Sequence, residues 1–189
     1  PERFSAAVAD FFSGGGQGLN ATIPHKASAY RLVQRHHESA RAAKTVNTLW
    51  QDPDGVLCGA NTDGVGLVRD LTVNLGLSVA GKRLLMLSAG GAARGVLLPL
   101  LQLGPACIVV LNRTNARADE LAAAFAERGP VRSSTVVRLA NDDPYDLVIN
   151  ATAASLSHDL PVLPANAINQ HTFCYDMAYG NGGTVFTRW

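Results

Sequence analysis

A lysine and an aspartate in two separate polar segments of this sequence could together perform acid/base chemistry. Lys26 ends the segment 20–26 (NATIPHK), and Asp63 lies in the segment 61–64 (NTDG). An ammonium group can give a proton to a carbonyl oxygen, and a carboxylate can hold that ammonium in place. Taken singly, the two residues are more simply interpreted as a solvated lysine and a helix-capping aspartate. The chemistry therefore depends on the elements that position them.

A glycine-rich turn follows an apolar strand-like run and precedes helix-forming residues. It spans 88–95 (SAGGAARG), after a predicted strand at 83–87. A dinucleotide-binding fingerprint requires this context, because glycines let the backbone approach a pyrophosphate whose charge meets the helix N-terminus. The fingerprint positions hold Ser88, Gly90 and Ala93, so a serine replaces the first glycine. That serine fits only if its φ stays negative or strain is accepted, and an ordinary glycine-rich turn is the alternative.

Two arginines follow the next predicted strand, at 107–111. They belong to the segment 112–117 (NRTNAR), where an NAD enzyme usually has an acid for the ribose 2'-hydroxyl. Arg113 and Arg117 suit a 2'-phosphate instead, since a guanidinium is permanently charged and can bind phosphate through two parallel hydrogen bonds. The segment therefore favours NADP over NAD. The alternative is a helix start with Thr114 as N-cap and solvated arginines.

The predicted elements divide into two α/β units, with a boundary between residues 76 and 77. There the composition changes from a helix-like stretch to a short basic pair and an apolar run. Residues 77–189 alternate strands with helices, which predicts a Rossmann-like, doubly wound parallel sheet that binds NADP, with strands at 83–87, 107–111, 146–150 and 172–177 and helices at 92–103 and 116–128. Residues 1–76 predict an incomplete α/β substrate domain, with strands at 19–22 and 46–50 and helices at 27–35 and 64–75.

Composition argues against several classes of protein. The 189 residues carry a net charge of +1 and no long Lys/Arg run, so neither nucleic acid nor a membrane surface is a predicted partner. No apolar run is long enough to span a membrane, and the N-terminus lacks a signal-peptide pattern. Cys58, Cys107 and Cys174 form no CxxC pair, and the histidines lack metal-ligand spacing, so no disulfide framework and no metal are predicted. A cytoplasmic location fits best. The sequence leaves the oligomeric state open, a homodimer included.

Taken together, these segments resemble the shikimate dehydrogenase family, NADP-dependent enzymes of aromatic amino acid biosynthesis. The resemblance spans nearly the whole chain, through 18–26, 45–49, 59–64, the glycine-rich turn, 112–114, 150–152 and 175–179. It implies an oxidoreductase that interconverts 3-dehydroshikimate and shikimate by hydride transfer, with NADP as cofactor. It also implies Lys26 and Asp63 as the catalytic pair, with substrate contacts from Thr22, Asn47, Asp63 and Tyr179.

The same resemblance implies three groups of cofactor contacts. The pyrophosphate would meet Ser88, Ala89, Gly90, Gly91 and Ala92, the adenosine 2'-phosphate would meet Asn112, Arg113, Thr114 and Arg117, and the nicotinamide side would meet Thr152 and Met177.

The sequence departs from the family pattern at its ends and in two loops. It lacks the N-terminal strand region with a serine pair for the substrate carboxylate, and it stops before C-terminal helices that bring a substrate-binding glutamine. We therefore expect a fragment. Ser88 replaces a glycine, and 153–155 (AAS) stands where the family has a serine and then a glycine. Two alternatives stay open, a paralogue that also accepts quinate and a non-catalytic NADP-binding fragment, and the flanking coding sequence would separate the enzyme from the latter.

Overall fold

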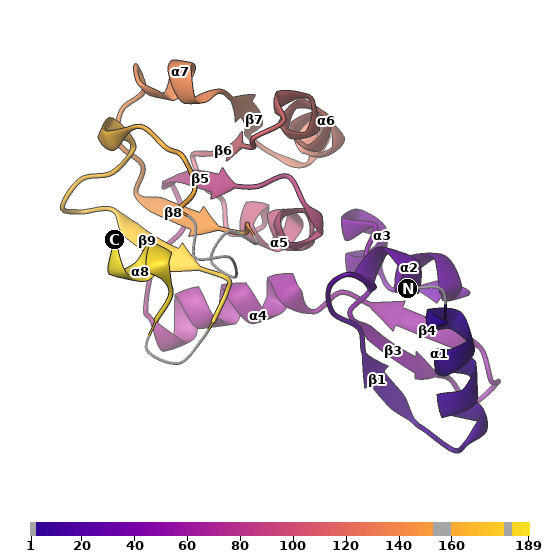
Figure 1. The fold of residues 1–189 in the computed structure, drawn as a ribbon. Helices are drawn as coiled ribbons and strands as arrows, with labels where there is room; N and C mark the ends of the chain where they lie inside the picture. The colour runs from indigo at the N-terminus through magenta and orange to yellow at the C-terminus, as the bar shows by residue number, and fades with distance from the viewer. Residues whose placement is uncertain (1–2, 153–159, 180–182) are drawn as a thin grey trace.

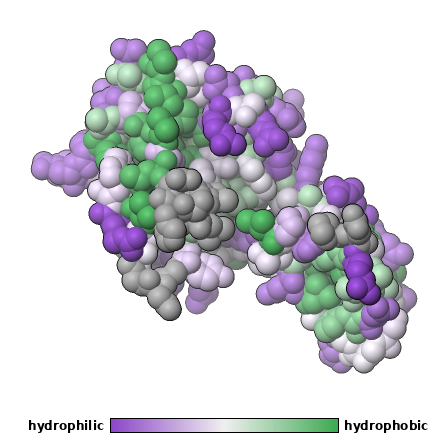
Figure 2. All heavy atoms as spheres, viewed as in Figure 1, coloured by the Kyte–Doolittle hydropathy of each residue, from purple (hydrophilic) through white to green (hydrophobic). Residues whose placement is uncertain are grey.

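A computed structural model describes residues 3–152, 160–179 and 183–189, and it contains two β-sheets in two lobes (Figure 1). The strand orders are β1-β3-β4-β2 and β7-β6-β5-β8-β9. Figure 2 shows the lobes joined at a narrow waist, with hydrophilic residues over much of the visible surface. Within the described residues, no helix is both long enough and apolar enough to cross a membrane.

The small lobe consists of the first sheet and three helices around one apolar core. Its strand β3 pairs antiparallel with both β1 and β4, whereas β2 pairs parallel with β4. Val8, Ala29, Val46 and Leu49 are among the buried core residues. The strands are β1 (Gly18–Asn20), β2 (Arg35–His36), β3 (Thr48–Gln51) and β4 (Leu57–Ala60), and the helices are α1 (Phe4–Ser13), α2 (Lys26–Leu32) and α3 (Glu38–Ala43).

The predicted helix at 27–35 is too long, because α2 ends at Leu32. Val33 already has an extended backbone, with ψ at 143°, and its side chain is buried in the core of the small lobe. The Gln34 N–H then donates to the Leu57 carbonyl at 2.9 Å, and Arg35 begins β2. Pairing with β4 therefore overrides the helix-forming composition of this segment.

The large lobe confirms the predicted Rossmann-like α/β fold, since all its neighbouring strands are parallel. The predicted strands at 83–87 and 107–111 are present with the expected bounds as β5 and β6. Apart from Arg83, both are apolar throughout, as expected for strands that are covered on both faces. The strands are β5 (Arg83–Leu87), β6 (Cys107–Leu111), β7 (Val131–Ser134), β8 (Leu147–Asn150) and β9 (Phe173–Asp176).

Helices cover both faces of the second sheet. Leu84 and Met86 of β5 share one core with α5 (Gly91–Leu101) and α6 (Asn115–Phe125), the latter followed by the 3-10 turn η2 (Ala126–Arg128). Leu85 and Leu87 face the other core. That second core is closed by short elements, namely α7 (Val136–Leu139), η4 (Ala165–Ala167) and α8 (Val185–Arg188).

One helical segment connects the two lobes. Helix α4 (Asp63–Arg69) begins three residues after β4 and continues into the π-helical turn η1 (Asp70–Asn74). Its Leu67 and Leu71 lie in the core of the large lobe. Helix α4 also packs closely on α5, because a Cβ atom at Gly64 would lie 2.5 Å from Pro99 Cγ and 2.7 Å from the Gly95 carbonyl oxygen. The division of the chain at 76/77 stays a prediction.

A tyrosine of β9 ties that strand to the π-helical turn. The Tyr175 hydroxyl donates a hydrogen bond to Asp70 Oδ2 at 2.8 Å. Burial, together with this carboxylate, raises the pKa of Tyr175 to about 12. The folded protein therefore keeps the phenolic proton to higher pH than the unfolded chain, in which the pKa is about 10. The resulting stabilisation is complete below the unfolded-state pKa and is lost as pH rises through the folded-state value.

We expect the Tm of the unsubstituted chain to fall more steeply between about pH 10 and pH 12 than the Tm of Tyr175→Phe, because phenylalanine has no proton to lose. Thermal unfolding followed by circular dichroism across this range would measure the two slopes. Burial also raises the pKa of Tyr145, but Tyr145 stays in both proteins, so its titration cancels in the comparison. Equal slopes would contradict the assignment of the raised pKa to Tyr175.

Candidate active site

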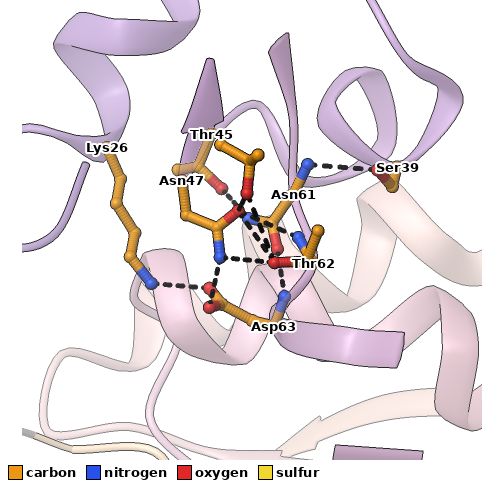
Figure 3. Close-up of polar contacts among 8 residues, drawn as sticks. Lys26, Ser39, Thr45, Asn47, Asn61, Thr62 and Asp63 are labelled. Atoms are coloured by element: carbon orange, nitrogen blue, oxygen red, sulfur yellow. Dashed lines mark hydrogen bonds and ion pairs between the residues drawn. The ribbon is translucent and has the colours of Figure 1, made fainter. Parts of the chain in front are cut away.

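The structure brings Lys26 and Asp63 together, although they lie far apart in the sequence. Lys26 is the first residue of α2 and Asp63 the first of α4. The Lys26 Nζ atom lies 2.6 Å from Asp63 Oδ2, and the two side chains are only 19% and 18% exposed (Figure 3). An ion pair that is largely shielded in this way is screened less by salt than one on an open surface. The pair is nevertheless accessible enough to meet a small ligand.

Asn47 holds the other oxygen of the same carboxylate. Its Nδ2 donates to Asp63 Oδ1 at 2.8 Å and also contacts Thr62 Oγ1 at 3.1 Å. Its Oδ1 in turn accepts a hydrogen bond from the Thr62 backbone N–H at 3.0 Å (Figure 3). Both carboxylate oxygens of Asp63 therefore have donors, which fixes the direction in which the carboxylate faces Lys26.

The two remaining predicted substrate contacts differ in their placement. Thr22 lies in the turn between β1 and α2 and is exposed, at the same end of the small sheet as Asn47, because the Ala21 N–H donates to the Asn47 carbonyl at 2.8 Å. Tyr179 follows β9 and is 95% exposed, and among the described residues no hydrogen bond joins it to the network around the ion pair. The substrate contacts of both residues stay predictions.

The predicted cofactor segments gather at one edge of the large sheet. They follow β5, β6, β8 and β9, whose last residues Leu87, Leu111, Asn150 and Asp176 are in register across the sheet. Helices α5 and α6 begin at the same edge. In doubly wound sheets, ligands bind outside the carboxyl ends of the strands, at the point where the strand order reverses. Here the order reverses between β5 and β8.

Ser88 adopts the strained conformation that the missing glycine would have avoided. Its φ is 123°, a value that favours glycine. The Ser88 N–H donates to the Leu111 carbonyl at 2.8 Å, and its Oγ accepts from the Gly90 N–H at 3.0 Å. The Ala89 N–H meanwhile donates to Asn112 Oδ1 at 3.1 Å. These bonds hold the glycine-rich turn against the loop after β6.

The two predicted phosphate-binding arginines, Arg113 and Arg117, are exposed beside this turn. Thr114 occupies the N-cap position of α6, but its side chain makes no capping hydrogen bond. Within the described part of the chain neither guanidinium forms an ion pair. Their predicted contact with a 2'-phosphate stays a prediction.

Thr152 and Met177 follow β8 and β9, and both bond Asn150. The Thr152 hydroxyl donates to Asn150 Oδ1 at 2.7 Å, and the Met177 N–H donates to the Asn150 carbonyl at 2.9 Å. Their predicted nicotinamide contact stays a prediction. The replacement at Ser155 falls outside the described residues.

Three buried or partly buried residues around the pair were not assigned a role from the sequence. Asn61 and Thr45 are 2% and 6% exposed, and the Asn61 Nδ2 donates to Thr45 Oγ1 at 2.8 Å. The Ser39 Oγ accepts from the Asn61 N–H at 3.1 Å (Figure 3). An asparagine just ahead of a predicted helix is a recognised signal for a side chain that bonds the helix start. That signal was present in the segment 61–64.

The fold and site define a class of protein, the two-lobed α/β oxidoreductases that bind a dinucleotide on a Rossmann-type sheet. Comparison with family models is more specific. Residues 1–49 match the shikimate dehydrogenase substrate binding domain, and residues 71–175 match the shikimate / quinate 5-dehydrogenase model. The chain belongs to the shikimate dehydrogenase family.

Curated relatives agree over the whole chain. A protein of Methylococcus capsulatus named shikimate dehydrogenase (NADP(+)) is 49% identical over 189 residues, which cover 100% of this chain and 67% of the relative. A protein of Hahella chejuensis with the same name is 48% identical over 188 residues, covering 100% of this chain and 68% of the relative. The chain thus spans about two thirds of the length of these relatives.

Solved structures share the fold. An Ael1 enzyme from Pseudomonas putida is 42% identical, with a TM-score of 0.91 over 99% of this chain and 68% of that one. Shikimate 5-dehydrogenase from Thermus thermophilus, solved in complex with NADP(H) and shikimate, is 31% identical, with a TM-score of 0.77 over 92% of this chain and 62% of that one.

Proposed function

We propose that this protein interconverts 3-dehydroshikimate and shikimate by hydride transfer with NADP(H), as a step of aromatic amino acid biosynthesis. The observation that carries the proposal is the Lys26–Asp63 ion pair at 2.6 Å, set at the start of the helix that packs on α5 of the Rossmann-type sheet. The curated relatives named shikimate dehydrogenase (NADP(+)) support the same substrate and cofactor.

In this proposal Lys26 moves the proton. In the direction of reduction its ammonium would hydrogen-bond the 3-keto oxygen and protonate it, which stabilises the developing alkoxide. Asp63 would hold that ammonium and bind a neighbouring hydroxyl of the substrate. Because the two residues act as one unit, we assign the acid/base role to the pair. Thr22, Asn47 and Tyr179 would supply neutral hydrogen bonds to the ring hydroxyls.

The carboxyl edge of the large sheet would hold the cofactor, whose nicotinamide gives or accepts the hydride. The residues present fit such a group. The first turn of α5 begins with Gly91 and leaves backbone N–H groups without partners inside the helix, and these suit a pyrophosphate. Arg113 and Arg117 suit a 2'-phosphate. In this proposal residues 1–76 bind substrate and residues 77–189 bind NADP.

A cytoplasmic location is the matching proposal for the compartment. Cys58, Cys107 and Cys174 are all free thiols. Free thiols persist where the compartment is reducing.

The test is shikimate-dependent reduction of NADP+ by the chain, followed by absorbance, with NAD+ and quinate in parallel assays. We expect turnover with NADP+ and shikimate, and a loss of at least about 1,000-fold in Lys26→Ala, since the proton donor is removed. NADP+ binding, measured by calorimetry, should persist in the variant.

The other possible results of this turnover test would support different conclusions. A preference for quinate would favour the paralogue. No turnover with either cofactor would contradict the proposal that this chain is itself an enzyme, and retained NADP+ binding would then favour the non-catalytic alternative. Full activity in Lys26→Ala would remove Lys26 from the mechanism.

A further inference from the structure

Asn61 and Thr45 form a buried polar contact between the small lobe and α5. They are hydrogen-bonded to each other at 2.8 Å, and each faces a glycine of that helix. A Cβ atom at Gly95 would lie 3.1 Å from Asn61 Nδ2, and a Cβ atom at Gly91 would lie 3.3 Å from Thr45 Cγ2. These glycines are four residues apart, so they share one face of the helix. The small lobe therefore rests directly on the backbone of α5.

The same Asn61 side chain binds the start of α4. Its Oδ1 accepts the hydrogen bond from the Asp63 backbone N–H at 3.0 Å. Asp63 is the first residue of α4, so its N–H has no partner within the helix, and Asn61 supplies that partner. The side chain of this same residue, Asp63, is the carboxylate that binds Lys26. The Asn61 amide thus contacts α5 at Gly95 and also bonds the first residue of α4. Figure 3 shows Asn61 beside Asp63.

We propose that Asn61 is a positioning residue, which fixes the Asp63 carboxylate relative to the N-terminal turn of α5. The inference rests on the proposed function, because that turn is where the pyrophosphate is expected to bind. Asn61 is 2% exposed, so it acts through Asp63 and has no surface to offer a substrate. Hydride transfer requires a fixed distance between the acid/base pair and the cofactor. A misplacement of about 1 Å can lower the rate by about 100-fold.

The first variant is Asn61→Ala, which removes the acceptor for the Asp63 N–H and the contact with Thr45. We expect kcat for shikimate oxidation to fall by about 30- to 100-fold, with KM for NADP+ changed by less than about threefold. Hydrogen exchange of the Asp63 amide, followed by NMR, should become at least about tenfold faster in the variant. This last measurement does not depend on turnover.

The second variant keeps Asn61 and changes the surface of α5 on which its side chain packs. Gly95→Ala would push the Asn61 amide by a few tenths of an ångström, whereas Gly66→Ala adds the same methyl group where nothing lies within 4 Å. We expect Gly95→Ala to lower kcat by about three- to tenfold and Gly66→Ala to leave it unchanged. Gly95→Ala also serves as the test if Asn61→Ala does not fold.

The proposal is overturned if Asn61→Ala keeps kcat within about twofold, or if the Asp63 amide stays equally protected. A loss of Tm with unchanged kcat per folded molecule would likewise assign Asn61 a purely structural role. If the unsubstituted chain shows no turnover, the proposed function fails on its own, and the exchange rates of the Asp63 amide still decide whether Asn61 positions it.

Discussion

Asp63→Asn should lower kcat for shikimate oxidation by about 100- to 10,000-fold while leaving NADP+ affinity within about threefold. The asparagine keeps the shape of the side chain but removes the charge that faces the Lys26 ammonium at 2.6 Å. The side-chain oxygen of the new asparagine would still accept the hydrogen bond from the Asn47 amide. Its NH2 group would then face the Lys26 ammonium, so two donors would meet and the ammonium would lose its acceptor. Steady-state kinetics and a calorimetric titration with NADP+ would separate the two effects.

Asp70→Asn is the matched control, because it changes a carboxylate of the same continuous helical segment. Asp70 binds Tyr175 and Asn74 in the described structure and has no part in the Lys26 network. We expect this control to retain kcat within about threefold. If both variants lost activity equally, general damage to the helix would explain the result, and the assignment of Asp63 to the acid/base pair would fail.

Gly64→Ala should destabilise the fold by about 2 kcal/mol, the second large effect that the structure predicts. The added methyl group would lie 2.7 Å from the Gly95 carbonyl oxygen, which is backbone and cannot rotate away, and 2.5 Å from Pro99 Cγ. Helices α4 and α5 would have to separate. Urea denaturation would measure the free energy of unfolding, and the Tm should fall by about 4–8 °C, given about 2–4 °C for each kcal/mol in a chain of this size.

Gly66→Ala measures the opposite effect in the same helix. Its Cβ atom would meet nothing within 4 Å. An alanine in a helix interior is favoured over glycine by about 0.5–1 kcal/mol, so this variant should be slightly more stable than the unsubstituted chain. Stabilisation of both variants would show that α4 and α5 do not approach as closely as Gly64 requires.

Strands β5 and β6 were predictable with correct bounds because burial on both faces requires apolar residues at successive positions, and only Arg83 departs from this. Strand β7 was missed because it is a short edge strand with exposed Arg132 and a polar Ser133, so its sequence has little strand character. Strand β2 was missed because it has only two residues and exists through its pairing with β4. Local sequence cannot indicate such pairing.

The candidate site was predictable as a set of residues and not as a geometry. Lys26 and Asp63 each stood in a recognisable polar segment, but their contact depends on how the starts of α2 and α4 meet. The bond between Asn61 and the Asp63 N–H is local, so the sequence carried a signal for it. The burial of Asn61 and its bond to Thr45 depend on packing in the folded chain and had no such signal. The strained φ of Ser88 was one of two outcomes that the sequence left open.

The helical segment that joins the lobes makes contacts in both of them, so a loss of packing in one lobe affects the other. Asp63 at its start binds Lys26 and Asn47 in the small lobe, while Leu67 and Leu71 lie in the core of the large lobe. In this described part of the chain, a continuous helical segment and not a flexible linker therefore connects the acid/base pair to that core. Heat or core substitutions that loosen the large lobe should therefore reduce turnover before the small lobe unfolds. The activity that remains would then report how well the core of the large lobe is packed.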